Sequence, residues 1–248
     1  MRILGVIPSR YGSTRFPGKP LHPLCGRPLV AWVVDAAKRA RRLDGVIVAT
    51  DDGRIAAAAA AAGATAVMTP PDLPSGTDRV ACAANPAPDD IVINIQGDEP
   101  LIDPALIDAL ADRLAADPRW SMATAATPVT SLEDLQSRTV VKVVVDRDDG
   151  ALYFSRLPIP CRRDGNPDLS SGLYLRHIGI YAYRGDFLRK MVAEPPCALE
   201  KTESLEQLRA LHMGARIAVL RTGQAGLGVD TPEDAGKVEA LLRARMGD

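Results

Sequence analysis

Short β-branched runs alternate with longer Ala- and Leu-rich stretches in the first half of the chain, and this alternation constrains the fold more than any other feature. The candidate strands are residues 3–7, 45–50, 65–68, 91–95 and 122–127, and the candidate helices are residues 28–42, 52–62, 77–84 and 104–115. Such alternation is typical of βαβ units. We therefore predict an α/β fold with a doubly wound, mainly parallel sheet.

The pattern changes after residue 140. Runs 140–145 and 151–154 are separated by Asp148-Asp149-Gly150, which predicts an antiparallel hairpin. A strand at 176–183, helices at 185–193 and 203–213, a strand at 216–220 and a helix from Pro232 follow. Since no linker or internal repeat interrupts the chain, we expect a single domain over 1–248, with a hairpin excursion at about 130–175 that could serve for dimerisation.

Charge and composition narrow the range of partners. The chain has 30 Lys and Arg residues and 31 Asp and Glu residues, so its net charge is too small to attract nucleic acid or a membrane surface. No apolar stretch reaches the roughly 20 residues of a membrane helix. The four cysteines lack CxxC spacing, which favours reduced thiols in a cytoplasmic protein. We expect no nucleic-acid partner and no membrane partner.

A cationic, glycine-containing loop follows the first predicted strand. It carries Arg10, Arg15 and Lys19 together with Gly12 and Gly18. Open α/β sheets bind ligands at the carboxyl ends of their strands, and this mixture of cations suits a triphosphate. A solvated basic loop is the alternative, and neither a P-loop motif nor a G-x-G-x-x-G motif is present.

Two aspartates are candidates for binding Mg²⁺. Asp98 follows the apolar strand 91–95, so it can reach the same crevice as the cationic loop. Mg²⁺ takes one or two carboxylates plus phosphates and water, and Asp230 is the second candidate. Asp230 also precedes Thr-Pro-Glu, so a helix cap is an equal alternative for this residue.

Several motifs together resemble those of the CMP-Kdo synthetase family of sugar nucleotidyltransferases, where Kdo is 3-deoxy-D-manno-octulosonate. In chain order they are R-Y-G-S-T-R-F-P-G-K-P (10–20), S-G-T-D-R (75–79), Q-G-D-E-P (96–100), A-L-Y-F-S-R (151–156), R-H-I-G-I-Y-A-Y (176–183), L-E-Q-L-R (205–209) and G-V-D-T-P-E-D (228–234). The chain departs from the family pattern at residues 136–139, 162–173 and 222–227, near the sugar side or the dimer lobe.

The resemblance implies a cytidylyltransferase of lipopolysaccharide biosynthesis that forms CMP-Kdo and pyrophosphate from Kdo and CTP. The anomeric hydroxyl of the sugar would attack the α-phosphate in line, with Mg²⁺ as cofactor, in a homodimer. A related acid, either 8-amino-Kdo or a sialic-acid-like nonulosonate, is the alternative substrate. A non-catalytic nucleotide-binding protein is an alternative of another class.

The resemblance also assigns residues to roles. Arg10, Lys19 and Asp98 would be catalytic, and Asp98 and Asp230 would bind the metal, whereas Glu99 would order the site. The CTP contacts would be Arg10, Ser13, Arg15, Lys19, Ser75 and Gly76. The sugar contacts would be Arg79, Gln96, Arg156, His177, Tyr181, Glu206 and Gln207.

The residues themselves leave some of these roles open. Ser75 is also a natural helix cap, and a lone His177 in a strand is often structural. Arg156 could instead order its loop or a dimer. Spacing places Glu203, Glu206 and Gln207 on one face of the predicted helix, and Glu203 could simply belong to a solvated acidic face.

Overall fold

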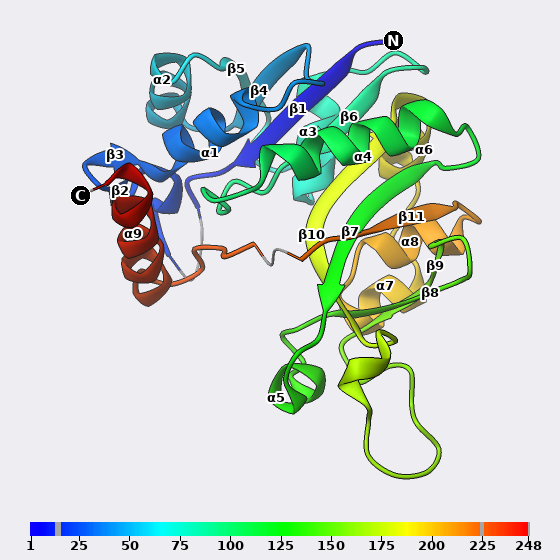
Figure 1. Cartoon of the computed structure of the whole chain (residues 1–248). Helices are drawn as coiled ribbons and strands as arrows, with labels where there is room; N and C mark the ends of the chain where they lie inside the picture. The colour runs from blue at the N-terminus through cyan, green and yellow to red at the C-terminus, as the bar shows by residue number, and fades with distance from the viewer. Residues whose placement is uncertain (13–15, 224–225, 248) are drawn as a thin grey trace.

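The computed structural model describes residues 1–12, 16–223 and 226–247, and it confirms the α/β fold. Within these residues one sheet contains nine strands (Figure 1). Seven of them run side by side in the order β11 (Ile217–Arg221), β7 (Met122–Pro128), β10 (Leu175–Arg184), β6 (Ile91–Asn94), β1 (Ile3–Ser9), β4 (Gly45–Thr50) and β5 (Thr65–Met68). β8 (Lys142–Val145) pairs with β10 and with β9 (Ala151–Ser155), which confirms the predicted antiparallel hairpin.

Helices cover both faces of the sheet, as a doubly wound fold requires. One face packs against α1 (Leu29–Lys38), α2 (Gly53–Ala61) and α4 (Pro104–Ala116), and the other packs against α3 (Gly76–Ala84), α6 (Gly185–Ala193) and α8 (Gln207–His212). The remaining helices are α5 (Leu132–Gln136), α7 (Ala198–Glu203) and α9 (Pro232–Met246), with short 3-10 turns at Lys19–Leu21 and Leu169–Ser171. In the described part of the chain, no helix is both long enough and apolar enough to cross a membrane.

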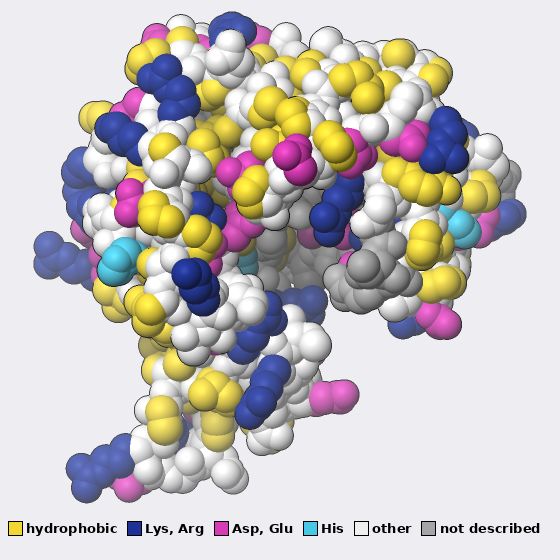
Figure 2. Space-filling view, turned by 180° about the vertical axis from the view of Figure 1, so that it is seen from behind, with side chains coloured by type: hydrophobic (Ala, Val, Ile, Leu, Met, Phe, Trp, Pro, Cys, Tyr) yellow, Lys and Arg dark blue, Asp and Glu magenta, His cyan; other side chains and the backbone are white. Residues whose placement is uncertain are grey.

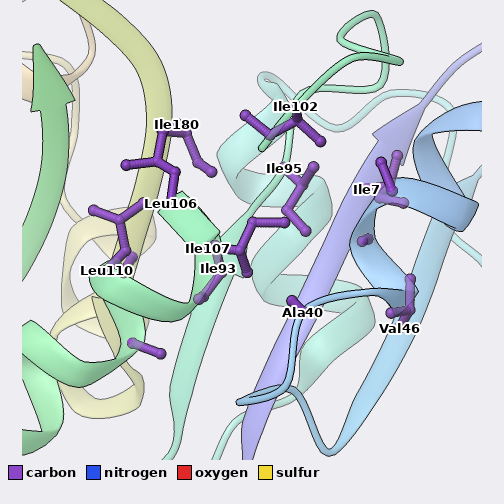
Figure 3. Close-up of a cluster of buried hydrophobic side chains, with 14 of the residues drawn as sticks. Ile7, Ala40, Val46, Ile93, Ile95, Ile102, Leu106, Ile107, Leu110 and Ile180 are labelled. Carbon is purple, nitrogen blue, oxygen red and sulfur yellow. The ribbon is translucent and has the colours of Figure 1, made fainter. Parts of the chain in front are cut away.

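The core forms because successive strand residues point to opposite faces of the sheet. On β1, Ile3 and Ile7 join one apolar cluster, whereas Leu4 and Val6 join the other. Figure 3 shows the first cluster, in which isoleucines of β6 meet α4. Burying each such side chain stabilises the fold by about 1.5–3 kcal/mol. The carboxyl ends of β1 and β6 are thereby held rigidly side by side.

β10 is the exception to the parallel arrangement. The sequence predicts its strand, but the structure inserts it antiparallel between β6 and β7. Its register against β7 shifts between Ile178 and Tyr181. Ile178 still joins the core on one face, while the rings of His177 and Tyr181 approach each other on the opposite face.

The single helix predicted over 203–213 is wrong. α7 ends at Glu203, Ser204 adopts a left-handed conformation with φ of 53°, and α8 begins at Gln207. Glu203 and Gln207 therefore belong to different helices. Their relative position cannot follow from helical spacing.

The C-terminal helix returns to the start of the chain. α9 packs against the hairpin of β2 (Pro23–Leu24) and β3 (Arg27–Pro28), as Figure 1 shows. Val229, Val238 and Leu242 share a small apolar core with Leu24 and Leu29. The Glu239 carboxylate also accepts a hydrogen bond of 2.9 Å from the backbone N–H of Cys25.

Candidate active site

A cavity of about 320 Å³ lies at the carboxyl ends of β1 and β6, beside the first turn of α3. It is lined by Pro8, Ser9, Arg10, Lys19, Pro20, Leu73, Pro74, Ser75, Gly76, Arg79, Gln96, Gly97, Asp98 and Asp230. Figure 2 shows that the molecule is hollowed on the face seen there, with basic and acidic side chains at the margin of the hollow. The predicted cationic and acidic groups thus meet in one place.

The loop after β1 is closed by its own backbone. The N–H of Gly18 donates to the carbonyl of Tyr11 at 3.1 Å, and Gly18 has a left-handed φ of 69°. A Cβ there would lie 3.2 Å from the Tyr11 ring, so the turn requires glycine. The Arg54 guanidinium stacks over the Tyr11 ring, 4.0 Å from its centre. Arg10 and Lys19 line the cavity, whereas the predicted contacts Ser13 and Arg15 lie outside the described residues.

The Lys19 ammonium joins the two predicted metal ligands. Its Nζ lies 2.7 Å from Asp98 Oδ2 and 3.4 Å from Asp230 Oδ1. The backbone N–H of Val229 donates to the Asp98 carbonyl at 2.8 Å, and this bond brings Asp230 to the crevice. The cap of α9 is formed by Thr231 with Asp234, so the alternative role of Asp230 as the helix cap is wrong.

This pair of carboxylates fits a magnesium ion bound together with a polyphosphate. Asp98 and Asp230 both approach the same cationic atom, which shows that they converge on one point. Over residues 1–12, 16–223 and 226–247 there is no group of three or more His, Cys, Asp or Glu side chains placed to hold a metal. Two carboxylates are sufficient for Mg²⁺ only if phosphate oxygens and water complete its octahedron.

The first turn of α3 borders the same cavity. Ser75 caps the helix, because its Oγ accepts hydrogen bonds from the N–H groups of Thr77 at 3.1 Å and Asp78 at 3.2 Å. The cap role considered for Ser75 is therefore confirmed. The N-terminus of a helix attracts anions through its free N–H groups and its dipole, which suits a phosphate-bearing ligand.

Arg79, predicted as a sugar contact, lies in the first cavity with the predicted CTP contacts and with Gln96. Its side chain is buried and donates to the Thr69 hydroxyl, and it also approaches the Asp51 carboxylate at 3.5 Å. It lines the first cavity and not the second one described below. The structure therefore separates Arg79 from His177 and Gln207.

A second cavity of about 390 Å³ adjoins the first. It is lined by Gln96, Asp98, Glu99, Thr139, Val140, Val141, Arg176, His177, Gly179, Tyr181, Leu205, Gln207, Gly228 and Asp230. Gln96, Asp98 and Asp230 line both cavities. A ligand in each cavity would therefore meet the other at the two carboxylates, which is the geometry that transfer between two substrates needs.

The polar groups of the second cavity include an uncharged aromatic pair. His177 Nε2 lies 2.9 Å from the Thr124 hydroxyl, and the His177 ring lies 5.4 Å from that of Tyr181. The Tyr181 hydroxyl donates to Gln207 Oε1 at 3.3 Å. Burial lowers the pKa of His177 to about 3 and raises the pKa of Tyr181 well above its usual range. Both side chains are neutral near pH 7, so they suit the hydroxyls of a sugar.

This burial predicts a loss of stability in mild acid. In the unfolded chain His177 takes up a proton near its ordinary pKa, whereas in the folded chain it does so only near pH 3. The unfolded state therefore binds more protons below about pH 6.5, and stability falls as the pH is lowered. Between pH 7 and pH 5 we expect His177 to contribute about 1 kcal/mol of this loss, after allowance for its partial exposure.

Urea unfolding at pH 7 and pH 5 measures the effect. His177→Gln should reduce the difference in unfolding free energy between the two pH values. His212→Gln, at the exposed end of α8, is the matched control and should retain the difference. An equal difference in the wild type and the His177 variant would contradict the assignment.

Arg156 and Glu203 contact each other's segments and do not line either cavity. The Arg156 guanidinium donates to the backbone carbonyls of Glu203 at 2.6 Å, Arg138 at 3.0 Å and Ser204 at 3.2 Å. The Glu203 carboxylate accepts from Ser155 Oγ at 2.8 Å and from the Arg156 N–H at 3.0 Å. The structure thus gives Arg156 the ordering role that was the alternative, and Glu203 is not a merely solvated acid.

Glu206 lines neither of the two joined cavities. Its carboxylate accepts a hydrogen bond of 2.5 Å from the Thr77 hydroxyl. It lines a third cavity, beside Pro74 and Arg209, that does not include Gln207. Of these two neighbouring residues, only Gln207 lines the second cavity.

Two residues of the second cavity have no predicted contact role. Burial, followed by the neighbouring Asp98 charge, raises the pKa of Glu99 to about 7. Arg176 lines the same cavity, and its contact with Asp134 is a long 4.0 Å. The adjacent acids of Q-G-D-E-P and the Arg-His pair that opens the β10 motif are the sequence signals that could have identified them.

Comparisons with known proteins agree with this geometry. A family model described as cytidylyltransferase matches residues 4–217. A protein of Bdellovibrio bacteriovorus named 3-deoxy-manno-octulosonate cytidylyltransferase is 53% identical over 246 residues, covering 99% of each chain. A protein of the same name from an Anaeromyxobacter species is 54% identical, covering 98% of each chain.

Solved structures show the same likeness. The structure of a CMP:2-keto-3-deoxy-manno-octonic acid synthetase complexed with CTP superposes with a TM-score of 0.92 at 41% identity, covering 99% of this chain and 100% of the other. A cytidylyltransferase from Leptospira borgpetersenii shares the fold, with a TM-score of 0.66 at 17% identity.

Proposed function

The chain belongs to the cytidylyltransferase family, and from this premise we propose that its two joined cavities hold CTP and 3-deoxy-manno-octulosonate side by side. The enzyme transfers the cytidylyl group of CTP to Kdo, which gives CMP-Kdo and pyrophosphate. The observation that carries the proposed arrangement is the sharing of Gln96, Asp98 and Asp230 by both cavities.

The first cavity is the nucleotide side in this proposal. Arg10 and Lys19 supply the positive charge that a triphosphate requires, and the capped N-terminus of α3 supplies N–H groups near Ser75 and Gly76. Ser13 and Arg15 remain predicted phosphate contacts in the same loop. Arg79 borders this side and holds the loop that carries Asp51.

Transfer then needs positioning and charge more than covalent chemistry. The anomeric hydroxyl of the acid attacks the α-phosphorus in line, and the bond to pyrophosphate breaks as the new ester forms. Lys19 can follow the charge that develops on the leaving pyrophosphate, because its ammonium already lies at the junction of the two cavities. No side-chain nucleophile is required.

We infer that Mg²⁺ is the cofactor and that Asp98 and Asp230 would hold it. When bound, the ion would neutralise the negative charge that develops on the phosphates in the transition state. The convergence of both carboxylates on the Lys19 ammonium supports this assignment. Lys19 itself would then turn from the carboxylates to the phosphates.

The second cavity is the sugar side. His177, Tyr181, Gln96 and Gln207 present neutral donors and acceptors to hydroxyl groups. The carboxylate of the acid also requires a cation. Arg176 lines this cavity, and its ion pair with Asp134 is long at 4.0 Å. Arg156 stays a predicted sugar contact that would have to exchange its three carbonyl partners for the substrate.

The predicted homodimer and the cytoplasmic location are part of the proposal. Leu152, Leu157 and Leu173 are more than half exposed around the hairpin excursion, which suits burial against a second copy of the chain. Cys25, Cys82, Cys161 and Cys197 are all free, as is typical of proteins in a reducing compartment.

A direct assay tests the function. The purified protein is incubated with CTP, Mg²⁺ and one acid at a time, namely Kdo, 8-amino-Kdo or a nonulosonate, and pyrophosphate release is followed. We expect the highest kcat/KM with Kdo. Turnover of a nonulosonate without turnover of Kdo would contradict the substrate, and release with no acid at all would contradict the transfer.

A further inference from the structure

Lys142 is a fully buried lysine at the start of β8. Its ammonium donates to the backbone carbonyls of Ser137 at 2.8 Å, Val140 at 2.6 Å and Arg156 at 2.6 Å. A lysine ammonium has three N–H donors, so each has a partner. Burying a charge is costly unless it is fully hydrogen-bonded, and therefore this side chain depends on all three carbonyls keeping their places.

Two of those carbonyls, of Ser137 and Val140, belong to the segment that forms one wall of the sugar cavity. Thr139, Val140 and Val141 line the cavity directly, and Ser137 and Val140 are held by Lys142 on either side of Thr139. The Val141 carbonyl in turn accepts a hydrogen bond of 2.8 Å from the His177 N–H. The lysine thus fixes the segment that faces His177 without lining the cavity itself.

The third carbonyl connects this wall to the opposite one. Lys142 holds the backbone of Arg156, and the Arg156 side chain holds the carbonyls of Glu203 and Ser204. The next residues of the chain, Leu205 and Gln207, line the cavity. A single chain of charge-assisted hydrogen bonds therefore runs from the Val140 segment to the segment that presents Gln207.

We propose that Lys142 is a positioning residue for the sugar acid, which sets the separation of the two walls of the sugar cavity. The inference rests on the proposed function. Lys142 is absent from the lining of the nucleotide cavity, and neither Asp98 nor Lys19 is among its partners. Its loss should therefore affect the acid and leave CTP binding nearly unchanged.

The test is a graded pair of substitutions, Lys142→Met and Lys142→Gln, assayed with Kdo as the acid. Methionine fills similar space but donates nothing, whereas the glutamine amide can serve two of the three carbonyls. KM for the acid is measured at saturating CTP, and KM for CTP at saturating acid. For Lys142→Met we expect KM for the acid to rise about tenfold and KM for CTP to change less than about twofold. Lys142→Gln should fall between the wild type and Lys142→Met.

Leu114→Ala is the control for a general loss of stability. Leu114 is fully buried on α4, near Trp120 and the start of β7, and it lines neither cavity. This variant should unfold at a lower temperature and retain both KM values.

Equal changes in the two KM values, or no change in either, would overturn the proposal. If neither lysine variant folded, Lys142 would be a determinant of folding and its role in positioning would also be overturned. Failure of the proposed function is distinguishable, because the wild-type protein itself would then not turn over Kdo.

Discussion

Asp98→Asn should lower kcat by at least about 10²-fold, which is the scale of removing one preorganised charged group from a transition state. Asparagine has the size of aspartate but no negative charge, so Asp230 would be the one carboxylate left in the predicted magnesium pair. The fold should persist, because the backbone carbonyl of residue 98 still accepts the bond from Val229.

Three measurements check this expectation. Steady-state kinetics gives kcat, a titration with Mg²⁺ gives the concentration needed for half-maximal rate, and thermal unfolding reports the fold. The Mg²⁺ requirement should rise in the variant. Asp35 lies on α1 and forms an ion pair with Arg27 at the surface. Asp35→Asn is the matched control, and it should change kcat less than about twofold. Wild-type kcat and wild-type Mg²⁺ dependence in Asp98→Asn would show that Asp98 does not hold the metal.

Lys19→Met should lower kcat/KM for CTP by about 10- to 150-fold, since a hydrogen bond to a charged group contributes about 1.5–3 kcal/mol. The Lys19 ammonium lies at the junction of the two cavities, and we expect it to turn toward the phosphates of CTP. KM for the acid should rise less than KM for CTP, because Lys19 lines the nucleotide cavity and not the sugar cavity.

Lys190→Met provides the comparison. Lys190 is an exposed lysine of α6 whose partner is Asp186 at 3.2 Å, and removal of its charge should leave both KM values unchanged. Lys19→Arg should retain more activity than Lys19→Met, because it keeps the charge. Comparable losses in the two apparent affinities of Lys19→Met would argue against a separate phosphate role.

Elements with a strong local signal could be predicted almost to the residue. The runs 45–50 and 65–68 are β4 and β5 as observed, and 185–193 is α6. In each case short-range pattern and tertiary packing favour the same structure, so nothing distant along the chain overrides the local preference. The residues at the carboxyl ends of β1 and β6 could be placed for the same reason, because the edge of a parallel sheet brings Lys19 and Asp98 together.

Other features depend on contacts that spacing cannot reveal. The helical pattern of 203–213 is interrupted because Ser204 turns left-handed, while Glu203 binds Ser155 and Arg156 far back in the sequence. The Glu206 carboxylate accepts a hydrogen bond from Thr77, which lies 129 residues earlier in the sequence. The antiparallel direction of β10 is likewise decided by its partners β6 and β7 and not by its own residues.

The packing of α9 against β2 and β3 has a consequence for the growing polypeptide. The predicted phosphate loop includes Gly18, and the second predicted metal ligand is Asp230. The apolar contacts of Val229, Val238 and Leu242 with Leu24 and Leu29 hold these two distant segments together. A nascent chain that has only just completed its sheet therefore lacks Asp230, the second predicted magnesium ligand. A protease that removed α9 would remove the apolar contacts beside Asp230, and we expect activity to be lost while most of the core remains folded.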